Sequence, residues 1–144
     1  MKSTIAAALA LALAVTFSTA AAQEPAPTRS VWSGVYSEEQ ATRGNALYAQ
    51  HCSSCHGDEL LGHEIAPALT GGAFAANWDG LTLGDLSERI RLSMPADSPG
   101  RLGRQQVADL LAFILSVGQF PAGRAELPRE AELLKQITIV ARKP

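Results

Sequence analysis

Both cysteines of the 144-residue chain lie in one short stretch, Cys52-Ser53-Ser54-Cys55-His56, and the other two histidines, His51 and His63, stand close to it. Cysteine and histidine at this density suit four chemistries: a zinc site, a redox-active dithiol, a disulfide or covalently bound haem. Each chemistry makes a different demand on the rest of the chain, so the surrounding sequence decides between them.

Three of these chemistries find little support in the sequence. A structural zinc site needs four ligands, usually as two separated pairs, and the chain has no second cysteine pair. A thioredoxin-like dithiol lies at a strand-to-helix turn, where the helix end lowers a thiol pKa, whereas this pair follows a predicted helix. A disulfide between Cys52 and Cys55 would close a very small loop and add little stability.

Covalent haem fits the pattern best, because Cys-x-x-Cys-His is the c-type attachment motif. The two thiols add to the vinyl groups on one edge of the porphyrin, and the next residue brings an imidazole to the iron. We therefore expect one haem c per chain, held by Cys52 and Cys55, with His56 as an iron ligand. His51 and His63 are too near His56 in sequence to reach the other haem face, and we expect both to be bystanders.

The iron then needs a sixth ligand, or an open position if it binds a gas. Met94 is the only methionine besides Met1. It follows a predicted helix and precedes Pro95, which disfavours helical geometry in the residue before it, whereas a core methionine would lie inside an apolar helical stripe. We expect Met94 to be the sixth ligand.

The apolar periodicity predicts an all-α fold with three main helices and long loops. Ser37 and Gln40 fit a capping box at the start of the first helix, Thr82 is the expected cap of the second, and Pro95 ends it. The third helix keeps an i, i+3, i+4, i+7 apolar stripe. Residues 57–80 are rich in glycine and are predicted to be a long loop with at most one short turn. The three helices are expected at residues 38–50, 81–94 and 104–117.

Residues 1–22 fit a secretory signal, with Lys2 before a short apolar run and small residues up to Ala22. We expect cleavage after Ala22, which gives an exported, soluble, periplasmic protein without a membrane span; an uncleaved anchor is the alternative. Loss of Lys2 leaves 11 basic and 14 acidic residues, a net charge of -3. No basic run is long enough to bind nucleic acid.

The mature chain divides into three predicted parts. Residues 23–36 form an N-terminal extension, in which Trp32 and Tyr36 are expected to dock on the body, although a partner contact is the alternative. Residues 37–118 form the main domain. Residues 119–144 form a tail with a weak helical signal and the β-branched run Ile137-Thr138-Ile139-Val140, which the pattern alone does not place.

Residues 37–118 resemble the class I c-type cytochromes, the monohaem cytochrome c family. Beyond the attachment motif and Met94, the spacing of Gly44 and Tyr48 is similar to that of the family's glycine and aromatic residue on the first helix. Leu110 and Phe113 resemble the leucine and aromatic pair of its last helix. The resemblance implies that these helices cross closely at Gly44, that Tyr48 packs against Leu110 and Phe113, and that the loops wrap one haem.

The resemblance also implies further contacts with the haem. Pro67 in Ala-Pro-Ala-Leu-Thr-Gly looks like the family's proline, whose carbonyl accepts the N–H of the haem-bound histidine. Trp78 looks like a tryptophan that reaches a haem propionate in some members. Arg89 and Arg91 are expected on a solvated helix face. No tyrosine corresponds to the one that often donates to the methionine sulfur.

Together these features predict an electron carrier, not an enzyme, which passes single electrons between redox proteins through a His/Met-ligated iron. We expect a monomer with a small docking surface, a dehydrogenase as donor and an oxidase or another cytochrome as acceptor. The flanking segments resemble those of small exported cytochromes that serve quinoprotein dehydrogenases. Two alternatives remain: a haem subunit of a dehydrogenase complex, and a gas-binding or gas-sensing haem protein in which Met94 is not a ligand.

Overall fold

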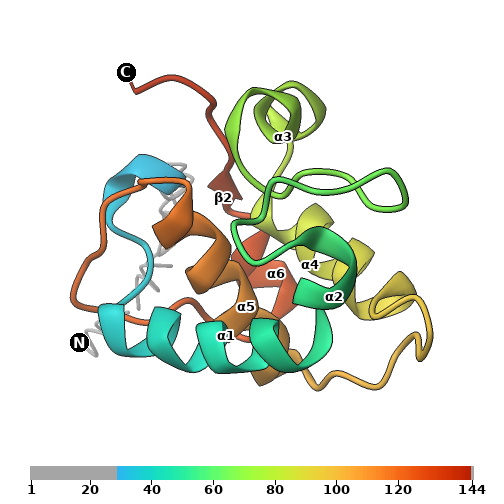
Figure 1. The fold of residues 1–144 in the computed structure, drawn as a ribbon. Coiled ribbons are helices and arrows are strands. Elements are labelled where there is room, and N and C mark those ends of the chain that lie inside the picture. Colours follow the sequence, from blue (N-terminus) through green and yellow to red (C-terminus); the bar gives the residue numbers. More distant parts are fainter. Residues whose placement is uncertain (1–28, 144) are drawn as a thin grey trace, which may run out of the picture.

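The three longest helices lie where the sequence predicts them (Figure 1). The computed structural model describes residues 29–143, so the predicted signal (1–22), the start of the extension and Pro144 lie outside the described residues. The two short strands pair in parallel, and the prediction of an all-α fold is confirmed. The elements in chain order are β1 (Arg29–Ser30), η1 (Val31–Ser33), α1 (Glu38–His51), α2 (Ser53–His56), α3 (Gly71–Trp78), α4 (Leu83–Ser93), α5 (Arg104–Val117), α6 (Ala131–Leu134) and β2 (Ile137–Thr138).

The start of α1 follows the prediction only in part. The Ser37 hydroxyl accepts a hydrogen bond from the Gln40 backbone N–H at 3.2 Å, so the cap forms. The expected return bond of the capping box was wrong, because the buried Gln40 side chain points to the tail instead. Gln40 Nε2 donates to the Leu127 carbonyl at 3.1 Å, and the Leu127 N–H donates to Gln40 Oε1 at 2.7 Å.

Helix α4 begins after the predicted cap Thr82 and ends before Pro95 as expected, so it is slightly shorter than the predicted range 81–94. The Thr82 hydroxyl accepts from the Asp85 N–H at 3.1 Å, and Asp85 Oδ2 accepts from the Thr82 N–H at 2.9 Å. The hydrogen bonds from Thr82 hold the pKa of the Asp85 carboxyl below its usual value. The helix stops at Met94, whose φ of -123° and ψ of 150° are extended, as the following Pro95 requires.

Helices α1 and α5 cross at Gly44 with their backbones in contact. A Cβ at position 44 would overlap the Asp109 carbonyl oxygen and lie 2.8 Å from the Phe113 Cβ. One turn later the Tyr48 and Phe113 rings pack with their centroids 5.3 Å apart. The predicted apolar stripe of α5 is buried throughout, at Val107, Leu110, Leu111, Ile114 and Leu115.

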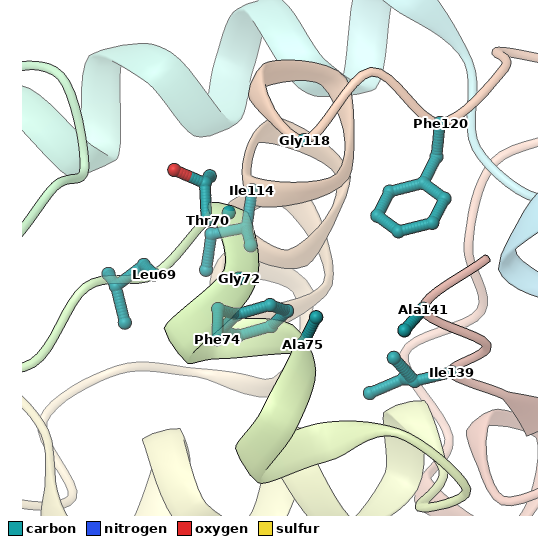
Figure 2. A pocket seen from close by; sticks show the side chains of 11 residues that line it. Leu69, Thr70, Gly72, Phe74, Ala75, Ile114, Gly118, Phe120, Ile139 and Ala141 are labelled. Carbon is teal, nitrogen blue, oxygen red and sulfur yellow. The ribbon is translucent and has the colours of Figure 1, made fainter.

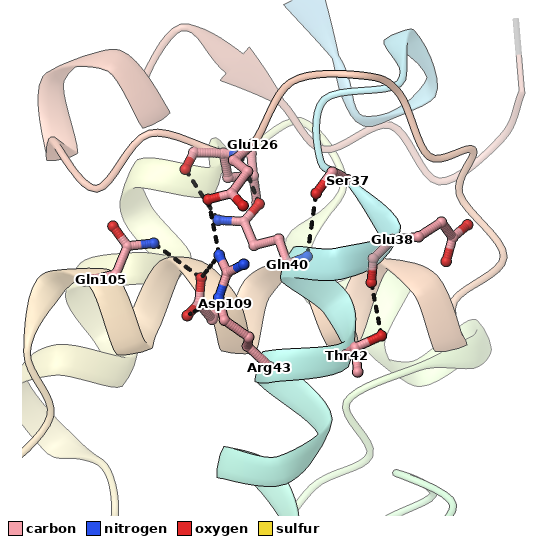
Figure 3. A network of polar contacts seen from close by, with 9 residues as sticks. Ser37, Glu38, Gln40, Thr42, Arg43, Gln105, Asp109 and Glu126 are labelled. Atoms are coloured by element: carbon pink, nitrogen blue, oxygen red, sulfur yellow. Dashed lines mark hydrogen bonds and ion pairs between the residues drawn. The ribbon is translucent and has the colours of Figure 1, made fainter.

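A charged network ties the same two helices to the tail (Figure 3). Arg43 on α1 donates from Nε and Nη2 to the two carboxylate oxygens of Asp109 on α5, at 3.2 and 3.1 Å. Asp109 is only 5% exposed, so its charge needs these partners, and Gln105 supplies a third bond at 3.0 Å. Arg43 Nη2 also donates to Glu126 of the tail at 2.8 Å.

The prediction for residues 57–80 was wrong in one respect, because the segment contains the two-turn helix α3. Its signal is weak because Gly71 and Gly72 open it, glycine is a poor helix former, and Thr70 makes no side-chain cap bond. Tertiary packing stabilises the helix instead. Phe74 is buried and lies one turn before Trp78, with the ring centroids 6.2 Å apart.

The extension and the tail pack on the main domain and on each other. Tyr36 donates its hydroxyl proton to the Phe120 carbonyl at 2.7 Å, and the Trp32 ring meets the Phe120 ring edge-on at 4.7 Å. Both contacts are with the tail, and Tyr36 is also buried in the common core with α5, against which Trp32 packs, so the two residues dock as expected. Phe120, Ile139 and the α3 residue Phe74 enclose an apolar cavity of about 220 Å³ between the tail and α3 (Figure 2).

None of the helices within residues 29–143 is long and apolar enough to cross a membrane.

The close crossing of α1 and α5 gives a first prediction. Gly44→Ala should destabilise the protein by about 1–3 kcal/mol, because the new methyl group cannot fit without separating the helices. Urea unfolding followed by circular dichroism measures the change. Gly72→Ala is the matched control, since a Cβ there meets no atom within 4 Å. Equal stability of the two variants would contradict the proposed backbone contact.

Candidate functional site

His56 is the last residue of α2 and is held in one orientation by Pro67. Its Nδ1 lies 2.8 Å from the Pro67 carbonyl oxygen, and the residue is only 7% exposed. A carbonyl oxygen can only accept, so Nδ1 of the neutral ring carries the proton and Nε2 keeps a free lone pair. That tautomer presents Nε2 as a metal ligand. The contact expected between His56 and Pro67 is present in the structure.

Gly62 brings the Pro67 carbonyl to His56, and sequence reasoning missed it. The Gly62 N–H donates to the His56 carbonyl at 2.9 Å. A Cβ at position 62 would lie 2.6 Å from the Pro67 carbonyl carbon, and the φ of +76° is in the left-handed region, so only glycine fits without strain. A lone glycine in a glycine-rich loop carries no signal by which the sequence could mark this role.

The two cysteines, His56 and Met94 line one cavity of about 400 Å³. This volume lies within the range of roughly 300–1,000 Å³ that is typical of ligand and cofactor sites. The wall is mainly apolar and comes from α1, α2, the end of α3, α4, α5 and the segments beside Pro67 and Met94. Further lining residues are Tyr48, His51, Ile65, Ala66, Leu69, Trp78, Leu86, Arg89, Ile90, Pro95, Asp97, Leu110 and Ile114.

The cysteines do not have the environment of a redox dithiol. Both are free thiols in the structure, with Cys55 exposed and Cys52 partly buried. Burial, followed by the proximity of Cys55, raises the pKa of the Cys52 thiol to about 11, whereas reactive dithiols need a lowered pKa. Within residues 29–143, no three His, Cys, Asp or Glu side chains gather in a way that could hold a metal ion.

The other residues singled out in the sequence differ in whether they border the cavity. Trp78 and Met94 both line the cavity, and the indole N–H of Trp78 makes no hydrogen bond to another residue in the described part of the chain. Arg91 lies on the solvated face of α4 and pairs with Glu88 at 3.3 Å, as expected. Arg89 is exposed too, but it also borders the cavity.

The two remaining histidines separate in the structure. His51, at the end of α1, lines the cavity, although it was expected to be a bystander. His63 is exposed and does not line it; it exchanges backbone hydrogen bonds with Ala66 at 2.9 and 3.1 Å.

Comparison with known proteins identifies the family. The family described as cytochrome c oxidase, cbb3-type, subunit III matches residues 39–114, more than half of the chain. The matched segment contains the cysteine motif, Pro67, Trp78 and Met94. The chain belongs to this family and is a class I c-type cytochrome.

A solved structure shares the fold of this cytochrome. One chain in the crystal structure of the sulfane dehydrogenase SoxCD from Paracoccus pantotrophus aligns with a TM-score of 0.52 and 23% identity, over 84% of this chain and 68% of that chain. No curated protein sequence matches the chain.

Membership of this family implies that the cytochrome is an electron-transfer protein with haem as its cofactor. The residues present fit that group. The cavity is mainly apolar, as a porphyrin face requires, and His56 and Met94 border it with a nitrogen and a thioether, two groups that haem iron takes as ligands in proteins. The tyrosine hydroxyls are used elsewhere, Tyr36 on Phe120 and Tyr48 on Gly57, so neither replaces the missing donor to the methionine.

Tyr48 supports the His56 side of the cavity and gives a pH-dependent prediction. Its hydroxyl donates to the Gly57 carbonyl at 2.6 Å, so Tyr48→Phe should lower stability by about 1 kcal/mol at neutral pH. Burial raises the pKa of Tyr48 from 10.0 to about 12. The bond's contribution is complete below pH 10 and is lost as the pH rises towards 12, because the unfolded tyrosine ionises first.

Urea unfolding of wild type and Tyr48→Phe at pH 7, 9, 10 and 11 measures this difference. The gap between the two proteins should shrink above pH 10. A gap that stays constant up to pH 11 would show that Tyr48 ionises normally and that the hydroxyl is not held by Gly57.

Proposed function

We propose that the chain is an exported monohaem c-type cytochrome that passes single electrons between redox proteins. In this proposal Cys52 and Cys55 bind the haem through thioethers, and His56 and Met94 are the iron ligands. The protein is periplasmic once residues 1–22 are removed, and its donor and acceptor are redox proteins such as a dehydrogenase and an oxidase or another cytochrome.

The observation that carries the proposal is one cavity that contains both cysteines, His56 and Met94. These residues come from two distant parts of the chain, the motif at 52–56 and the end of α4, and Met94 is the sole methionine after Met1. A structural methionine would be packed in a helix interior, whereas Met94 is partly buried at the end of α4 and borders the cavity.

The surrounding residues prepare the site for electron transfer rather than for catalysis. When bound, the haem iron takes up and releases one electron between Fe(III) and Fe(II). His56 is held by Pro67, so its ring need not reorient between the two states. The thioether of Met94 favours the reduced state and raises the potential. Leu86, Ile90 and Leu110 make their part of the cavity wall apolar.

The rim of the cavity supplies a surface for brief contacts with partners. Ile65 lines the cavity and is 80% exposed, and Cys55, which is exposed too, lines the same cavity. Redox encounters use small, weak interfaces, and an exposed apolar side chain at the cofactor edge fits such a contact. The net negative charge of the mature chain favours partners with a basic docking surface.

Attachment and export are tested together by mass spectrometry of protein recovered from the periplasm. The mass should show the loss of residues 1–22 and the gain of one haem that survives acid-acetone extraction. Cys52→Ser with Cys55→Ser should lose the covalent haem. Ser53→Ala, which lies between the cysteines but outside the cavity lining, should retain it. Covalent haem in the double variant would refute the proposed attachment.

Ligation by Met94 is tested by the optical spectrum of the oxidised protein. Met94→Ala should abolish the weak far-red sulfur-to-iron band and lower the reduction potential, because the iron loses its thioether ligand. Leu92→Ala is the matched control, since Leu92 is exposed near the same helix end and should leave the band intact. An unchanged spectrum in Met94→Ala would instead favour the gas-binding alternative with an open iron position.

A second candidate function is a haem subunit of an oxidoreductase complex. It is supported by the description of the matching family, a subunit of a cytochrome c oxidase, and by the name of the protein in the similar structure, a sulfane dehydrogenase. Gel filtration of protein from its native source separates the candidates. A carrier elutes at the mass of one chain, whereas a subunit elutes with its partner at high salt.

A further inference from the structure

The last residues of the tail lie between the N-terminal extension and the connection from α3 to α4. The Ile139 N–H donates to the Leu81 carbonyl at 2.8 Å, and the Gly80 N–H donates to the Ile139 carbonyl at 2.9 Å. From the other side, Trp32 Nε1 donates to the Val140 carbonyl at 2.9 Å. Both edges of this segment are thus hydrogen-bonded, and Ile139 itself is buried.

Two further contacts join the tail to the beginning of α4 and to the connection that precedes it. A Cβ at Gly84 would overlap the Lys135 side chain and lie 2.8 Å from the Lys135 backbone nitrogen, so α4 and the end of α6 touch through their backbones. Asp79 Oδ1 accepts a hydrogen bond from the Ala141 N–H at 2.8 Å. Leu134 of α6 is buried in the same core.

These contacts hold the end of α3 and the start of α4, the two helices that form the Met94 side of the cavity. The connection they hold, residues 79–82, lies directly between Trp78 and the first residue of α4. Helix α4 then runs for 11 residues, about 16 Å at 1.5 Å per residue, and ends at Met94, whose N–H donates to the Ile90 carbonyl at 2.9 Å. A helix is stiff over this length, so the position of its start governs the position of Met94.

The His56 side of the cavity is held by different contacts. His56 bonds to Pro67, Gly62 bonds to His56, and Tyr48 bonds to Gly57. All of these bonds lie within residues 48–67, and none involves the tail. A disturbance of α6 or β2 therefore reaches the Met94 side of the cavity without first reaching the His56 side.

We propose that residues 131–141 are a positioning element for Met94: they hold α3 and α4 at their junction and so set the strength of the bond from the methionine sulfur to the iron. The inference rests on the proposed function, in which Met94 is an iron ligand. Gly84 and Asp79 are the positioning residues, and they act through α4 rather than by touching the haem.

The first test replaces Gly84 in the haem-bound protein. Gly84→Ala should push α4 away from Lys135 and weaken the sulfur–iron bond, so the far-red band loses intensity. Added imidazole competes with Met94 for ferric iron, and its apparent affinity should rise about tenfold as the competing ligand weakens. The content of covalent haem should stay that of wild type. Gly72→Ala, a helical glycine with open space around it, should change none of these readouts.

A second pair of variants decides the question if Gly84→Ala does not fold. Asp79 is exposed, so Asp79→Ala removes the acceptor for the Ala141 N–H without opening the core. It should raise imidazole affinity severalfold. Asp79→Asn keeps an oxygen that can accept this hydrogen bond, so it should restore the wild-type affinity; a merely electrostatic role of the carboxylate would give no such rescue.

The outcomes separate this inference from the proposed function. If Met94→Ala abolishes the band while Gly84→Ala and Asp79→Ala keep wild-type imidazole affinity, Met94 is a ligand and the positioning role of the tail is refuted. If Met94→Ala itself leaves the band unchanged, the proposed ligation has failed, and the inference falls with it.

Discussion

The backbone contact between α1 and α5 at Gly44 is the constraint on which the rest of the structure depends. Helix α1 leads directly into the cysteine motif, and Leu110 and Ile114 of α5 line the cavity. The distance between these two helices therefore sets the distance between the motif and this wall of the cavity. Because backbone meets backbone, the spacing does not depend on a side-chain rotamer. The Arg43–Asp109 pair lies at the crossing itself, because Arg43 precedes Gly44 and the Asp109 carbonyl faces it, and it opposes rotation of the helices about the crossing.

The cavity is a destabilising feature that the contact between α1 and α5 must offset. Core cavities cost about 24 cal/mol per Å³, so an unfilled space of about 400 Å³ would cost on the order of 10 kcal/mol as an upper bound, because this cavity opens to solvent at Cys55. That figure is comparable with the whole stability of a typical domain, roughly 5–15 kcal/mol. The chain alone therefore forms an incomplete core, and a haem in the cavity stabilises the fold by linkage.

Local chemistry explains which features the sequence could predict. Ser37, Thr82 and Pro95 act on neighbouring residues, so the ends of α1 and α4 follow from short motifs. Helix α3 could not be predicted, because it depends on the burial of Phe74 against residues far away in the chain. The bonds between the Gln40 side chain and Leu127 could not be predicted either, because these residues are 87 positions apart. The cysteine motif, Pro67 and Met94 were found by motif and resemblance, but Gly62 and Gly84 were missed, since a glycine's role is visible only from what its absent Cβ would touch.

The two sides of the cavity differ in the same way: local contacts hold the His56 side, and contacts between distant parts of the chain hold the Met94 side. On the His56 side, the bonds from Tyr48 to Gly57 and from His56 to Pro67 join residues 9 and 11 positions apart, so this side is nearly fixed by its own stretch of sequence. On the Met94 side, the bonds from Ala141 to Asp79 and from Trp32 to Val140 span 62 and 108 positions. The two chain ends can therefore vary, and shift the α3–α4 junction, without altering the Cys-x-x-Cys-His motif. In the proposed function the thioether of Met94 raises the potential, so small changes in the tail would adjust electron transfer while the His56 side and the cysteine motif stay constant.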